Sequence, residues 1–514
     1  MKLNYKKTIY VGFAFFLISA FWQAYDSIIP KILTDKFGMS QSFSGVIMAL
    51  DNILALFLLP LFGALSDKCN SKRGRRTPYI IVGTIIAAVV FVALSFADNM
   101  QKTNIADVDI DNSSALENLY NAGLTIKTPE GREVIINENF SFEEFTSIEM
   151  FAADGTTTKE YTDYVVPARQ KYAWKMTTES PFSLIFFIGL LLIVLLAMSV
   201  FRSPAVALMP DVTIKPLRSK ANAVINLMGT AGGMLVLVTG IILKTGQTQN
   251  AVMSYIPFFS IVSAIMIVAL LVFLRKVDEP KFVREMEEES RLYGVSDEDE
   301  EKELENSGHA GELMKEEKVS LILILLSVVL WYMGYNAVTS KYSVYASKVL
   351  NVDYNMTLLI AQGVAIVSFI PVGMISSKLG RRKTILIGIS LLTFAFIVAS
   401  FLRAGSPMWA MNLLFSIAGI GWATINVNSF PMVVELSKRG NVGKYTGYYY
   451  TASMLAQTIT PVLSGIFLDM KFTSLFPYAA VFTFGSFVTM FFVKHGDSKP
   501  ETKESLIQHF DVDD

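Results

Sequence analysis

Two aspartates lie inside long apolar segments of the chain, where ionisable side chains are rare. Asp51 lies near the middle of segment 41–65 and is followed by Asn52, and Asp26 lies beyond the middle of segment 8–33. A charge within a hydrocarbon layer is costly, so a side chain of this kind usually has a function. A carboxylate held away from water takes up a proton more readily near neutral pH. We therefore predict that Asp51 and Asp26 are proton-coupling residues; sodium ligation and hydrogen bonding between helices are the alternatives.

Motifs for other chemistries are missing from the sequence. The three histidines lie outside the apolar segments and Cys69 is the only cysteine, so we expect no metal site built on these residues. No Walker glycine-rich loop occurs, which argues against an ATP-driven pump. No nucleophile, base and orienting group share a local motif, so we predict that the protein is not an enzyme and needs no cofactor or metal.

Twelve apolar segments position the two aspartates. The chain is 52% hydrophobic and 17% charged, with a mean hydropathy of +0.44, which is typical of a membrane protein. About 20 apolar residues suffice for a helix to cross a bilayer. The predicted fold is an all-α membrane protein whose twelve transmembrane helices cover approximately 8–33, 41–65, 77–97, 181–202, 219–243, 251–274, 319–346, 354–376, 384–403, 408–434, 443–468 and 474–493.

A loop rich in glycine and arginine occurs once in each half of the chain. It reads GALSDKCNSKRGRR at 63–76 and GMISSKLGRR at 373–382. The spacing between the copies matches that between Asp211 and Glu435 once residues 98–180 are subtracted. We therefore predict two pseudo-symmetric six-helix bundles, one of which carries an insertion.

The predicted domains follow from this duplication. The N-terminal bundle covers 1–274 and the C-terminal bundle 319–494, with an acidic cytoplasmic linker at 275–318 and a cytoplasmic tail at 495–514. The insertion 98–180 contains alternating β-branched residues around a Pro-Glu-Gly turn. A small extracellular cap with β structure and a mobile acidic loop are the alternatives for this insertion.

Lysine and arginine gather in the short loops after the second, eighth and tenth apolar segments. Such loops are usually cytoplasmic, so we expect both termini in the cytoplasm and a multi-pass protein of the cell membrane. The formal net charge of −1 gives no indication of a nucleic-acid partner. We expect a monomer surrounded by lipid.

These motifs resemble the major facilitator superfamily over almost the whole chain. The hallmark loop of that family is present, with a longer gap before the Gly-Arg-Arg, and Ser377 replaces the aspartate in the second copy. The segments SDKCNSKRGRRTPYI, RSPAVALMPDV, RSKANA, PMVVEL and GKYTGYYY look like the sucrose/proton symporter branch and its relatives among the glycoside/cation symporters.

On physical grounds, such a loop can act as a latch at a cytoplasmic gate. We expect the loop arginines to reach carboxylates or helix ends of the other bundle only when the cytoplasmic side is closed; the alternative is a role in topology alone. A simpler reading of Arg202, and also of Lys341, is that the long side chain reaches the membrane interface. The predicted gate residues are Gly63, Asp67, Gly74, Arg75, Arg76, Arg202, Asp211, Arg381, Arg382 and Glu435.

Amide, carboxylate and aromatic side chains recur at helical spacing in both halves. Amides and carboxylates can bond sugar hydroxyls, and an aromatic ring can cover the apolar face of a sugar ring. Transporters place their substrate where the two halves meet, whereas helix packing is the alternative role for any single pair. The predicted substrate-binding residues are Trp22, Gln23, Asn52, Trp331, Tyr332, Tyr335, Asn336, Gln362, Trp422, Asn426 and Gln457.

The resemblance and the intramembrane carboxylates together favour a secondary active transporter that imports a glycoside or disaccharide with a proton by alternating access. Sodium is the alternative coupling cation. A proton-coupled exporter of drugs or metabolites and a membrane sensor that does not transport are the alternative functions.

Overall fold

The computed structural model describes residues 3–153, 157–214, 217–293, 314–436 and 442–496 of the 514-residue chain. Within these residues, eleven helices are long and apolar enough to cross a membrane. Helix α14 (Tyr354–Leu379) adds a further apolar helix to this set. The predicted all-α membrane fold is therefore confirmed.

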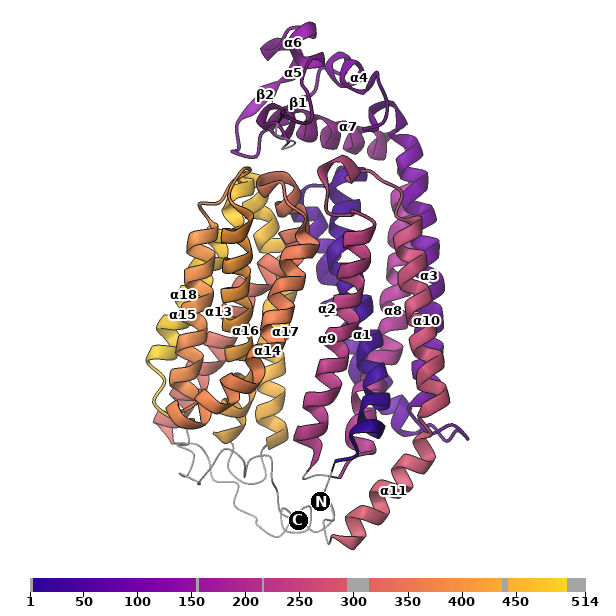
Figure 1. Ribbon diagram of the computed structural model, residues 1–514, viewed down its shortest axis with the longest axis vertical. Helices are drawn as coiled ribbons and strands as arrows, with labels where there is room; N and C mark the ends of the chain where they lie inside the picture. Colours follow the sequence, from indigo (N-terminus) through magenta and orange to yellow (C-terminus); the bar gives the residue numbers. More distant parts are fainter. Residues whose placement is uncertain (1–2, 154–156, 215–216, 294–313, 437–441, 497–514) are drawn as a thin grey trace.

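The helices form two bundles that stand side by side (Figure 1). Each bundle has its own apolar core, and the two cores share no residue. The N half contains α1 (Tyr5–Lys31), α2 (Gln41–Asp67), α3 (Thr77–Asn104), α8 (Phe182–Asp211), α9 (Arg218–Ile242) and α10 (Ile256–Lys276). The C half contains α13 (Lys315–Tyr345), α14, α15 (Arg381–Ala399), α16 (Met408–Glu435), α17 (Val442–Met470) and α18 (Leu475–Phe491).

Local sequence explains where the first two helices begin. The Asn4 side chain accepts a hydrogen bond from the Lys7 amide at 3.1 Å, and the Ser40 hydroxyl accepts one from the Phe43 amide at 3.3 Å. Such caps satisfy amides that have no partner inside the helix. Helices α1 and α13 each continue as one wider turn, η1 (Ile32–Lys36) and η6 (Ala346–Leu350).

The predicted insertion folds as a cap over one end of the two bundles (Figure 1). Strands β1 (Thr125–Lys127) and β2 (Glu133–Ile135) pair antiparallel around a turn in which the Gly131 amide donates to the Thr128 carbonyl at 2.8 Å. The remaining elements are η2 (Ala106–Val108), α4 (Ala115–Asn121), α5 (Ile136–Asn139), α6 (Phe142–Thr146), η3 (Tyr161–Val165) and α7 (Val166–Glu179). The β-containing cap is therefore the correct alternative, and α3 runs past its predicted end at residue 97.

The predicted acidic linker begins as an ordered helix, α11 (Glu279–Leu292). Residues 294–313 of the linker and most of the predicted tail lie outside the described residues. We call the two ends of the bundle pair the cap end and the α11 end (Figure 1).

Candidate functional site

Three charged side chains on long apolar helices of the N half lie within electrostatic range of one another. Asp26 of α1, Asp51 of α2 and Arg202 of α8 interact electrostatically with one another. Asp51 also accepts a hydrogen bond from the Asn52 amide group at 2.8 Å. The Arg202 guanidinium lies over the ring of Trp22, 5.4 Å from its centroid. The charges of both carboxylates therefore act on one guanidinium among half-buried side chains.

This position of Arg202 differs from the expected reach to the membrane interface, and its assignment to the gate stays a prediction. Arg202 is near the end of an apolar segment in the sequence, but α8 continues to Asp211. The side chain therefore lies along the length of the helix, half-buried, where the charges of Asp51 and Asp26 favour its charged form. Burying an arginine side chain costs free energy unless carboxylates lie nearby to offset its charge.

Asp26 faces the C half. It interacts electrostatically with Tyr335 of α13, and α1 packs directly against α13. The ring of Tyr335 stacks on that of Trp422 with centroids 3.8 Å apart and planes 5° apart. Tyr332 meets Trp422 edge to face, with a centroid distance of 5.6 Å. An aromatic group of the C half is thus associated with the carboxylates of the N half.

Polar side chains connect the halves near this group. The Gln362 amide of α14 donates to Gln23 Oε1 of α1 at 2.7 Å. Gly233 of α9 borders this contact, and a Cβ there would lie at ordinary van der Waals distances of 3.5 Å from Gln362 Oε1 and 3.7 Å from Gln23 Oε1. Within the described residues, Trp22 Nε1, Gln362 Oε1 and Asn336 Nδ2 are buried and have no hydrogen-bond partner. These atoms are free to bond the hydroxyls of a ligand.

Other predicted substrate-binding residues lie apart from the contacts described above. Trp331 is fully buried in the core of the C half, and its assignment as a substrate-binding residue stays a prediction. The reason for this burial is helix rotation, because Trp331 and Tyr332 point about 100° apart on α13. Asn426 is exposed, and the Gln457 amide donates to Ser453 O of its own helix at 3.4 Å.

The loop between α2 and α3 forms a charge cluster at the α11 end. Arg76 pairs with Asp211 at 2.8 Å and with Asp67 at 2.5 Å, and Arg75 pairs with Asp211 at 3.0 Å. Burial alone would lower the pKa of Arg76, but the hydrogen bonds and charges of Asp211 and Asp67 outweigh it and raise this pKa. Arg76 Nη1 also lies 3.5 Å from the Gly63 carbonyl oxygen.

Asp67 and Asp211, the partners of these arginines, belong to the N half. Contacts to the C half are expected only in a conformation that is closed on the cytoplasmic side. The described conformation therefore pairs Arg75 and Arg76 within their own bundle. In the second copy, Arg382 donates to the Phe491 carbonyl of α18, and Arg381 also has a partner. The side chain of Glu435 lies outside the described residues.

Glu279, the first residue of α11, forms a contact at this end of the N half that the sequence did not predict. Its carboxylate accepts from the amides of Arg75 at 2.8 Å, Arg76 at 2.9 Å and Thr77 at 2.8 Å, and from the Thr77 hydroxyl at 2.7 Å. It therefore caps the N-terminus of α3. The Asp-Glu-Pro sequence directly after the last apolar segment of the N half was the available signal.

The two halves are joined tightly at the cap end. The Asp469 carboxylate of α17 accepts from the amides of Gln41 at 2.6 Å and Ser42 at 2.8 Å, at the start of α2. Lys341 is fully buried and donates to the Gln41 carbonyl at 2.8 Å, which contradicts the expectation that it extends to the membrane interface. A Cβ at Gly45 would lie 2.0 Å from the Pro461 carbonyl oxygen, so only glycine allows this crossing of α2 and α17.

Comparison with known families gives two matches. Residues 173–461 and 356–510 match the model described as Major Facilitator Superfamily, so the first match alone spans more than half of the chain. Residues 10–107 match the model described as MFS/sugar transport protein.

Sequence relatives match over a short stretch. The sucrose transport protein SUC3 of Arabidopsis thaliana is 38% identical over 70 residues, and SUT3 of Oryza sativa subsp. indica is 32% identical over 73 residues. Each alignment covers 14% of this chain, and 11% and 14% of the respective relatives. The chain therefore aligns with only a small part of the length of these proteins.

Solved structures match over nearly the whole chain. The inward open xylose transporter XylE from E. coli has a TM-score of 0.55 at 16% identity, covering 96% of this chain and 97% of that one. A bacterial homologue of the iron transporter ferroportin, in an inward-facing state, has a TM-score of 0.59 at 11% identity, with 95% and 99% covered. At these identities the likeness shows a shared fold.

Proposed function

The chain belongs to the Major Facilitator Superfamily, and from this premise we propose that it is a secondary active transporter that imports a sugar together with a proton. The observation that carries the proposal is the group of Asp26, Asp51 and Arg202 on three helices of the N half, whose charges act on one another and, through Asp26, on Tyr335 of the other half. In transporters built from two repeats, the substrate site lies between the halves and opens alternately to the two sides of the membrane.

Charge balance in this group favours a proton as the coupling ion. Two ionised carboxylates and one guanidinium carry a net charge of −1, and one bound proton makes the group neutral. A net charge costs more than a neutral group where water is scarce. Proton binding therefore changes the energy of the group by an amount that can bias the two conformations.

The surroundings of this group favour a sugar as the cargo. The stacked rings of Tyr335 and Trp422 can cover the apolar face of a sugar ring. The unpaired atoms of Trp22, Gln362 and Asn336 can bond hydroxyls. The matched relatives are named sucrose transport proteins, and a structure of the same fold is a xylose transporter. A disaccharide is the cargo class that we propose.

Arg202 links the proton site to the sugar site. Its guanidinium interacts with both carboxylates and lies over the ring of Trp22. A carboxylate that loses its proton attracts Arg202 more strongly, which alters the cation–π contact with Trp22. Proton release and sugar release are thereby coupled through one side chain.

We further propose the orientation with both termini in the cytoplasm, on the basis of the lysine- and arginine-rich loops. In this orientation the cap lies outside the cell and the Asp67–Arg76–Asp211 cluster lies at the cytoplasmic side. The polar contacts at the cap end then correspond to a closed outer side. We propose that Arg75 and Arg76 exchange partners toward the C half when the inner side closes.

The test is uptake of radiolabelled sucrose into proteoliposomes with an imposed pH gradient, compared with sodium-gradient and no-gradient vesicles. The parent protein is expected to accumulate sucrose only with the pH gradient. Asp51→Asn is expected to lose accumulation but keep exchange of labelled for unlabelled sucrose. Asp111→Asn, at an exposed cap residue, is the matched control and is expected to behave as the parent.

Accumulation by Asp51→Asn at the parental level would remove Asp51 from the coupling role. Accumulation driven by sodium alone would replace the proton as the coupling ion. Absence of sucrose flux under all conditions, with saturable sucrose binding, would favour the sensor.

A further inference from the structure

The cap is a folded unit with an apolar core of its own. Its two strands and short helices enclose this core, which the loop before α10 completes through Val252. Since the chain enters the cap from α3 and leaves it into α8, the cap is covalently part of the N half. The fully or nearly fully buried core residues include Ile105, Val108, Leu119, Ile126, Ile136, Phe145, Tyr161 and Val165.

Helix α7 fixes the cap to the N half. The Thr177 hydroxyl donates to the Phe37 carbonyl at 3.0 Å and accepts from the Gln101 amide at 2.9 Å. Gly38 has φ +69°, and a Cβ there would lie 2.2 Å from the Trp174 amide nitrogen. Helix α7 therefore packs on the backbone that joins α1 to α2, and the cap cannot move freely relative to the N half.

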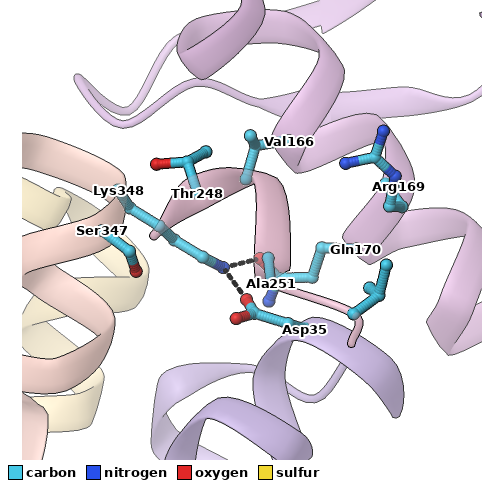
Figure 2. A pocket seen from close by; sticks show the side chains of 9 residues that line it. Asp35, Val166, Arg169, Gln170, Thr248, Ala251, Ser347 and Lys348 are labelled. Atoms are coloured by element: carbon cyan, nitrogen blue, oxygen red, sulfur yellow. Dashed lines mark hydrogen bonds and ion pairs between the residues drawn. The ribbon is translucent and has the colours of Figure 1, made fainter. Parts of the chain in front are cut away.

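One side chain of α7 also bridges to the C half. Gln170 donates from Nε2 to the Met39 carbonyl at 3.0 Å and accepts at Oε1 from Lys348 Nζ at 2.8 Å. Lys348, from η6 of the C half, also pairs with Asp35 of the N half at 3.2 Å. Figure 2 shows Lys348 extending between Asp35 and Gln170. Lys348 is thus held by the cap and by the N half together.

A second contact repeats this arrangement. Asn351 Oδ1 accepts from the hydroxyl of Thr157 in the cap at 2.8 Å and from that of Thr248 in the N half at 2.7 Å. Asn351 follows η6 and has φ +57°, a conformation that asparagine and glycine tolerate. Asn351 of the C half therefore accepts hydrogen bonds from the cap and from the N half.

A third contact joins the cap hairpin to the end of α17. The Phe472 amide donates to the Pro129 carbonyl at 2.9 Å. A Cβ at Gly131 would lie 2.6 Å from the Met470 carbonyl oxygen. The cavity between the cap and both halves, lined by Asp35, Arg169, Gln170 and Lys348 among others, measures only ≈ 20 Å³. This volume accommodates about one water molecule, so the junction is a packed contact and has no room for a sugar.

We propose that the cap is a strap that keeps the cap end closed by holding the C half through Gln170, Thr157 and the hairpin carbonyl of Pro129. Opening of the cap end separates the C half from the N half, to which the strap is fixed, so these contacts must break. A contact made in only one conformation shifts the equilibrium toward it. The inference rests on the alternating access of the proposed function but not on the identity of the solute.

The test measures opening of the cap end with a cysteine reporter. In a Cys69→Ser background, which removes the only cysteine, Ser44→Cys places a thiol at a fully buried position of α2 beside Gly45. Maleimide reacts with this thiol when the cap end opens. The test variants are Gln170→Leu and Asn351→Gly, and each removes both hydrogen bonds of its side chain. Gln249→Leu is the control, because Gln249 is exposed and its amide bonds to Gln247 of its own loop.

We expect each test variant to speed labelling roughly 2- to 10-fold, and the control to leave the rate unchanged. Labelling rates of both variants within a factor of about 2 of the parent would overturn the strap. Limited proteolysis checks that the cap stays folded; if Gln170→Leu unfolds it, Asn351→Gly, which lies outside the cap, decides.

The assay needs no sugar and no gradient. Faster labelling without any sucrose flux would support the strap and refute the proposed cargo. Unchanged labelling in a protein that accumulates sucrose would refute the strap and leave the proposed function intact.

Discussion

Gly74 and Glu279 form the contact whose disruption has the most specific expected result. Gly74 has φ +98°, and a Cβ there would lie 2.3 Å from Glu279 Cδ and 2.4 Å from Oε2. The carboxylate of Glu279 is only 1% exposed and accepts from three amides and one hydroxyl at the start of α3. Gly74→Ala therefore displaces the carboxylate from its donors, in addition to straining the backbone.

The expected free energies of unfolding follow from these contacts. Glu279→Ala removes a charged cap from buried amides and is expected to cost about 3 kcal/mol. Gly74→Ala is expected to cost about 1–2 kcal/mol for the left-handed backbone, and about 2 kcal/mol more for the displaced carboxylate. In the double variant no carboxylate remains to be displaced, so Gly74→Ala adds only the cost of backbone strain to the cost of Glu279→Ala. The two substitutions are therefore expected to show a coupling energy of about 2 kcal/mol.

The assay is unfolding of the purified protein in mixed micelles, for the parent, both single variants and the double variant. Glu285→Ala is the matched control on the same helix, because Glu285 is 40% exposed and its pair with Lys7 at 3.1 Å is a surface contact worth about 1 kcal/mol at most. Additivity of Gly74→Ala and Glu279→Ala to within about 0.5 kcal/mol would refute the reasoning. A loss for Glu279→Ala no larger than for Glu285→Ala would refute the capping role.

Three further predictions concern the site and the cap end. Trp422→Ala removes the stack on Tyr335 and is expected to weaken sucrose binding, measured by calorimetry, about 10-fold. Trp422→Phe is expected to keep most of the affinity. Equal affinities of Trp422→Ala and the parent would show that the ring does not contact the sugar. Arg202→Gln leaves two carboxylates without the nearby cation and is expected to abolish thermal stabilisation by sucrose. The double variant Arg202→Gln with Asp51→Asn is expected to restore part of this stabilisation. If the double variant is not stabilised either, the charge-balance argument is wrong. Asp469→Asn weakens the cap on α2 and is expected to lower the free energy of unfolding by about 1–2 kcal/mol; a parental value would show that the contact is energetically neutral.

The aromatic and amide residues show how far sequence reasoning reaches into the site. Helical spacing places Trp331, Tyr332 and Tyr335 on one helix, but spacing alone does not say which face of that helix meets the other half. The structure turns Tyr335 toward Trp422 and Asp26 and buries Trp331 in the core. The rotation of a helix that is apolar on all sides is set by packing against its neighbours, and this information is not local.

The sequence by itself determined the membrane fold and the family resemblance, and it predicted the two related halves and the roles of Asp26 and Asp51, because apolar length, duplication and charges within apolar segments can be read along the chain. Only the tertiary structure decided that Arg202 lies within electrostatic range of those carboxylates, that Glu279 caps α3 and that Lys341 bonds the Gln41 carbonyl of the other half. These contacts join residues far apart in the chain, and their partners depend on how the helices and the cap pack against one another.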